Sequence, residues 1–174
     1  MSGMTGMSGM HDTAMHADAT SGTGAMFTPT EAGQGAFATI AEIVSILQSN
    51  PATDWSNVSI DALRAHLIDM SEVTLNSKVE RTTTDQSTVF RVTGEGRTIA
   101  SIQRMVTAHA PMLSADTGWS VETETIDDGA TMTITASEPT DLAKIAALGF
   151  YGVMTIGAHH QMHHLMIAEG HDPH

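Results

Sequence analysis

Histidines near the end of the chain have the spacing of a helical chelate. Residues 157–166 read GAHHQMHHLM, in which His159 and His163, and likewise His160 and His164, are four residues apart. Residues at i and i+4 share one face of an α-helix, so the two imidazoles of each pair can reach one ion. Neighbouring positions are about 100° apart around the helix, so we expect one pair rather than all four rings to form a mononuclear site. The segment predicts a transition-metal site.

The spacing resembles the zinc-protease motif His-Glu-x-x-His in its ligands alone. His160 stands where that motif has its general-base Glu, which disfavours a protease of this type. In composition the methionine-rich start of the chain is similar to bacterial periplasmic copper-handling proteins, and this likeness covers residues 1–26 only. It implies a role in copper binding.

The many methionines of the chain favour copper over zinc. The chain has 13 Met and no Cys, and Met1, Met4, Met7 and Met10 recur every third residue in a segment that has no core pattern. Thioethers favour Cu(I) and imidazole accepts Cu(II), so we expect copper, with Met162 as a further ligand inside the histidine segment. Zinc is the alternative. Haem is a further alternative, and it would be non-covalent because the attachment motif needs cysteine.

A short recurring motif extends the ligand set. An apolar residue, any residue, Ala and then His occurs three times, ending at His66, His109 and His159. Met70 and Met112 follow the first two histidines by four and three residues, close to the same helix faces. A lone histidine is more often a hydrogen-bonded core residue, so His66 and His109 are ligand candidates only through the repeat. Met70 and Met112 rank behind them.

The elements that position these residues form an internal repeat. Apolar residues at helical spacing predict helices that begin near residues 28, 59, 98 and 139, with Ser59 as the cap of the second. The third is disturbed near its end by Pro111, and the last is interrupted around 149–152. Alternating residues predict strands at 73–83, 88–93, 119–126 and 131–135, with Asp127-Asp128-Gly129 as the strongest turn. The order predicts an α+β fold in which duplicated αββ units form a four-stranded antiparallel sheet covered by helices, with a His-rich C-terminal helix.

Composition limits the partners. A net charge of −13 disfavours nucleic acid and anionic membranes, and no apolar run is long enough for a membrane span. We expect residues 1–26 to be a disordered Met/His-rich tail and residues 27–174 to be a single α+β metal-binding domain. We also expect an exported, periplasmic protein whose signal peptide has been removed. The crowded histidine helix suggests a homodimer, and a copper-trafficking protein is a further expected partner.

Two classes of function compete on this evidence. The favoured one is a periplasmic copper-binding protein that sequesters, buffers or delivers the ion. The other is a copper or zinc metalloenzyme in which histidine ligands leave an open position for substrate. Asp69 and Glu169 are its candidate proton-transfer groups, but no nucleophile or base motif singles them out. We therefore favour binding over catalysis.

Overall fold

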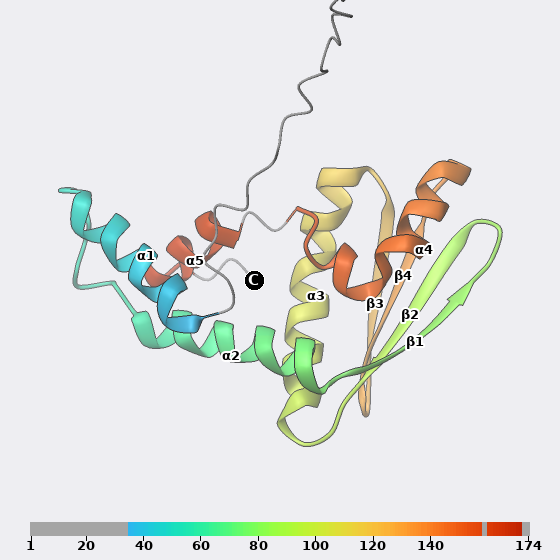
Figure 1. The fold of residues 1–174 in the computed structure, drawn as a ribbon, viewed down its shortest axis with the longest axis horizontal. Coiled ribbons are helices and arrows are strands. Elements are labelled where there is room, and N and C mark those ends of the chain that lie inside the picture. The colour runs from blue at the N-terminus through green and yellow to red at the C-terminus, as the bar shows by residue number, and fades with distance from the viewer. Residues whose placement is uncertain (1–34, 158–159, 172–174) are drawn as a thin grey trace, which may run out of the picture. The chain divides into compact units, whose positions relative to one another are not determined.

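Residues 35–157 and 160–171 are described by a computed structural model. The elements follow one another as α1 (Ala36–Ser49), α2 (Ile60–Asn76), β1 (Lys78–Thr83), β2 (Ser87–Thr93), α3 (Arg97–Thr117), β3 (Ser120–Ile126), β4 (Gly129–Thr135), α4 (Pro139–Val153) and α5 (His160–Ala168) (Figure 1). The predicted α+β class is confirmed. The tail expected at 1–26 and the helix start expected near 28 lie outside the described residues. No helix among those described is long and apolar enough to cross a membrane.

The sheet shows the duplication directly. Its strands are antiparallel in the order β1-β2-β4-β3, so each αββ unit contributes one inner and one outer strand. The inner strands pair with Phe90 opposite Met132 and Val92 opposite Ala130, and all four residues are buried. Alternate residues of a strand point to one face, which explains why these positions form a continuous apolar surface. The predicted repeat of helix and hairpin is confirmed.

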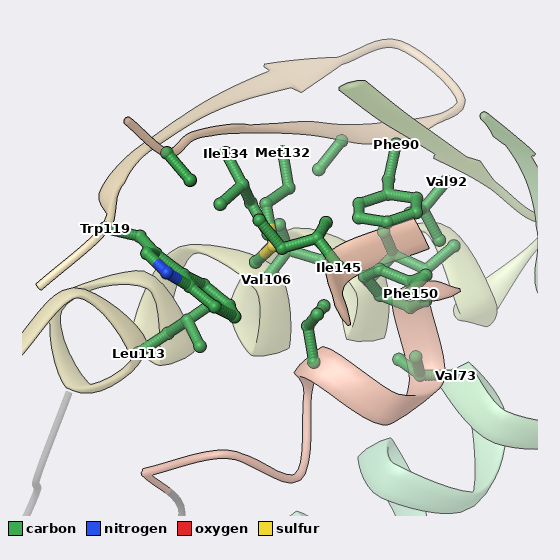
Figure 2. Packing of buried hydrophobic residues seen from close by; sticks show 14 residues of the cluster. Val73, Phe90, Val92, Val106, Leu113, Trp119, Met132, Ile134, Ile145 and Phe150 are labelled. Carbon is green, nitrogen blue, oxygen red and sulfur yellow. The ribbon is translucent and has the colours of Figure 1, made fainter. Parts of the chain in front are cut away.

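Helices α3 and α4 cover this apolar face. Val106 and Leu113 of α3 are buried together with Ile145 and Phe150 of α4. Figure 2 shows these side chains lying between the strands and the two helices, with Trp119 at one end of the cluster. This is the first of two hydrophobic cores formed by the described residues, and we call it the sheet core.

The other three helices form a separate core. We call it the helical core; its buried residues are Ile43 and Leu47 of α1, Leu63 and Leu67 of α2, and Ile167 and Ala168 of α5. Helix α2 contacts α3, α1 and α5 rather than lying across the sheet, and its Val73 belongs to the sheet core (Figure 1). The prediction that the helices cover the sheet therefore holds for α3 and α4, whereas α1, α2 and α5 pack on one another.

The start of α2 is joined to the end of α5. The hydroxyl of Ser59 caps α2 by accepting a hydrogen bond from the backbone N–H of Ala62, as the sequence predicts. The backbone N–H of Ser59 donates to the carbonyl of Ala168 over 2.6 Å. One residue thus caps one helix and holds the other, which fixes α5 beside α2.

Two predicted boundaries are wrong. The strand expected to begin at Val73 begins at Lys78, because α2 continues to Asn76. Val73 falls three residues after Met70 and is buried, so it extends the apolar face of the helix. Helix α3 passes through Pro111 and ends at Thr117, where Gly118 adopts a left-handed conformation. Burial of Leu113, two residues after Pro111, offsets the lost backbone hydrogen bond.

The predicted interruption before the last helix is confirmed and is longer than expected. Gly149 has a φ of 62° and kinks α4, which then ends at Val153. A second break separates α4 from α5, and Gly157 within it passes against the backbone of Met112. Gly157 therefore lies beside α3.

Candidate metal centre

Three histidines from two helices lie in contact. The ring centroid of His66, on α2, is 4.8 Å from that of His163 and 5.6 Å from that of His164, both on α5. The two α5 rings are 6.4 Å apart. We call His66, His163 and His164 the imidazole group. The histidine in α2 that only the repeat suggested is therefore a neighbour of the C-terminal cluster.

The helical core positions the imidazole group. His66 lies between Leu63 and Leu67, and both leucines are buried against α1 and α5. His164 precedes Ile167 and Ala168 by three and four residues, so it shares their buried face. His164 is accordingly 5% exposed, while His66 and His163 are half-buried. Apolar packing around the rings brings the imidazoles together at the contact between α2 and α5.

The three rings of the imidazole group are close enough to share an ion, but their nitrogens are not arranged around a common point. Imidazoles that bind one ion through nitrogens about 2 Å from it have ring centres roughly 5 Å apart, close to the observed separations. However, both rings of α5 meet His66 edge to face. Within residues 35–157 and 160–171, no three His, Cys, Asp or Glu side chains are arranged to hold a metal ion. Coordination therefore requires the rings to turn about their side-chain torsions.

Asp69, one turn after His66, connects α2 to α3. Its carboxylate accepts hydrogen bonds from the Ser101 hydroxyl at 2.7 Å and from Arg104 at 2.8 and 3.0 Å. Burial by itself would raise the pKa of Asp69, but these hydrogen bonds and the charge of Arg104, with a smaller electrostatic contribution from His66, hold that pKa below its usual value. A carboxylate held in this way is a poor proton acceptor, which argues against a proton-transfer role for Asp69.

The Asp69 contacts give a stability prediction. Replacing Asp69 by Asn should lower the free energy of unfolding at pH 7 by about 1–2 kcal/mol, because a charge-assisted network is lost. A lowered folded-state pKa stabilises the fold above the unfolded value of 3.8, and this contribution disappears as the pH falls through the folded pKa. The difference between wild type and Asp69→Asn should therefore shrink below about pH 4.

Urea unfolding at a series of pH values measures this difference. The matched control is Asp85→Asn, at an exposed turn residue, which should leave the unfolding free energy nearly unchanged. A difference between wild type and Asp69→Asn that stays constant down to pH 3 would contradict the proposed network.

His109 belongs to a different environment. It is buried in α3, and its Nε2 lies 3.1 Å from the carbonyl oxygen of Val153, the last residue of α4. Val153 is part of the sheet core. The structure thus places His109 at the end of α4, whereas His66, its counterpart in the repeat, joins the imidazole group.

The remaining predicted ligands do not join the imidazole group. Met70 is half-buried and packs against the helical core, while Met162 is exposed on α5. Met112 lies in α3, where its backbone contacts Gly157. His159 and the side chain of His160 lie outside the described residues, so the first member of each predicted i, i+4 pair has no described position. What the structure brings together is the second member of each pair, His163 and His164, with His66.

The sequence contains one signal for this arrangement that spacing alone did not show. His164 is followed at i+3 and i+4 by Ile167 and Ala168, which marks its side of α5 as buried.

Comparison of the chain with protein-family models, curated proteins and solved structures gives no significant match. The functional argument therefore rests on the residues described above.

Proposed function

We propose that this chain is a periplasmic copper-binding protein that sequesters, buffers or delivers the ion, with the imidazole group as its holding site. The observation that carries the proposal is the contact of His66 with both His163 and His164. A second copy of the chain or a copper-trafficking protein would be its partner.

Donor chemistry supports copper for this group. Imidazole nitrogen binds Cu(II) and Zn(II), and a given nitrogen site generally binds Cu(II) more tightly than Zn(II). Of the soft sulfur ligands, the chain lacks cysteine and is rich in methionine. Methionine adds affinity for Cu(I) and contributes little to zinc sites. The combination suits an ion that is handled in both oxidation states.

The electrostatic field also suits a cation. Seven Lys and Arg oppose 20 Asp and Glu, which gives the net charge of −13. Such a field raises the local concentration of cations at the surface. In this proposal residues 1–26, which lie outside the described part, collect Cu(I) through their regularly spaced methionines.

Titration of the full-length protein with Cu(II) tests the proposal. Electron paramagnetic resonance should show nitrogen coupling, and His66→Ala or His163→Ala should each weaken binding by about tenfold or more, because each removes one donor. His171→Ala is the matched control, since His171 is exposed just beyond α5 and should have little effect.

Melting of the metal-free variants verifies that they are folded. Equal, small losses from all three substitutions would indicate non-specific surface binding and overturn the proposal. Elemental analysis of the protein purified without an affinity tag then distinguishes copper from zinc.

A further inference from the structure

Three side chains of helix α5 depart from the usual distribution, although Ile167 and Ala168 of the same helix are buried as expected. The helix buries His164, which is 5% exposed, and exposes Met162 and Met166, which are 59% and 38% exposed. The hydrophobic effect favours the opposite arrangement, with thioethers inside and a titratable ring outside. Met105 and Met154 follow the usual rule, since both are half-buried and pack against the sheet core. The methionines of α5 are therefore not placed as core-filling residues.

The two exposed thioethers are neighbours on the helix. Met162 and Met166 are at i and i+4, about 40° apart around the axis, with Cβ atoms about 6 Å apart. His163 lies about 60° beyond Met166 on the same side. Its ring contacts His66, which in turn contacts His164. The potential ligands thus run from the exposed thioethers through half-buried rings to a buried one.

We propose that Met162 and Met166, together with His163, form a surface site next to the imidazole group, and that this site binds a soft monovalent cation of the Cu(I) class. This inference rests on the proposed function, because that function supplies the copper. Thioethers are neutral, soft donors that favour Cu(I) over divalent zinc. The site is thus selective by ligand type, and His163 is the ligand it shares with the imidazole group.

The test uses Ag(I), which has the same charge and softness as Cu(I) and does not change oxidation state under the conditions of the titration. The full-length protein is labelled with ¹³C in its methionine methyl groups, and Leu substitutions assign the Met162 and Met166 signals. Both signals should shift together as Ag(I) is added. Met162→Leu should weaken the response of Met166 by about tenfold, because one of two chelating sulfurs is lost. Met105→Leu, which removes a methionine from the sheet core, should leave it unchanged.

Residue-level signals keep the methionines of residues 1–26 from obscuring the result. The inference is overturned if Met162 and Met166 do not shift at Ag(I) concentrations that saturate those methionines, or if Met162→Leu leaves the Met166 response intact. Cu(II) titration read by nitrogen coupling separates the two proposals. If Ag(I) does not shift the Met162 and Met166 signals but Cu(II) shows nitrogen coupling, the methionine site alone is rejected. If Ag(I) shifts both signals but Cu(II) shows no nitrogen coupling, the methionine site is supported and the imidazole group is rejected.

Discussion

With free Cu(II) at a hundred times its dissociation constant, the melting temperature of the full-length protein is expected to rise by about 5–10 °C. An ion that binds only the folded state stabilises it by about 2.7 kcal/mol at this concentration. For a chain of this size, each kcal/mol corresponds to a shift of roughly 2–4 °C. The effect is large because His66 and His163 come together only when α5 is packed against α2.

Calorimetry on four proteins tests this expectation. His66→Ala should lose most of the rise, and the control His171→Ala should keep it. A truncated chain that begins at Phe27 should also keep it while binding fewer Cu(I) ions, since the imidazole group lies wholly within the remaining residues. If the truncation abolishes the rise, residues 1–26 are part of the site, and a self-sufficient imidazole group is the wrong description.

Replacing Gly129 by Ala is expected to lower the free energy of unfolding by about 3 kcal/mol. Gly129 follows the Asp127-Asp128 turn and pairs with Thr93 at the end of the central strand pair. A Cβ at residue 129 would collide with the carbonyl oxygen of Val92 and approach the backbone of Thr93. Because backbone atoms cannot move aside as a flexible side chain does, the contact between β2 and β4 must open.

Gly118→Ala is the matched control for Gly129→Ala. Gly118 has a φ of 73° at the end of α3, and nothing lies within 4 Å of the position that a Cβ would take. Its substitution should therefore cost only about 1 kcal/mol of conformational strain. Urea unfolding of both variants gives the comparison, and equal losses would show that crowding at Gly129 is not the cause.

Local features of the fold were predictable because their causes are local. The cap at Ser59 and the turn before Gly129 depend on a few consecutive residues, and the strand alternation around Phe90 depends on one buried face. The ends of α2 and α3 were not predictable from the same rules. Val73 fits both a helix and a strand pattern, and Pro111 is tolerated because of distant residues that bury Leu113.

The candidate site was predictable only in part, for a related reason. Spacing of four residues identifies the rings that share a face of one helix, and it led to pairs that begin at His159 and His160. It contains no information on which face of α5 meets α2. That depends on the helical core, to which Leu63 of α2 and Ile167 of α5 both belong and which brings His66 to α5. The recurring motif suggested His66 as a ligand without identifying its neighbours.

The hydrogen bond from Ser59 to Ala168 has a consequence for the order of assembly. Closing a flexible loop of about 100 residues costs roughly 4 kcal/mol of chain entropy, so this contact is unfavourable in an otherwise unfolded chain. The two αββ units lie between these residues. Each contains a pair of strands that are adjacent in sequence, and such local contacts form faster than distant ones. We therefore expect the docking of α5 on α2 to be the last step of folding. A growing polypeptide therefore cannot assemble the three rings before α5, residues His160–Ala168, has been synthesised, so binding of an ion at the proposed site would follow the docking of α5.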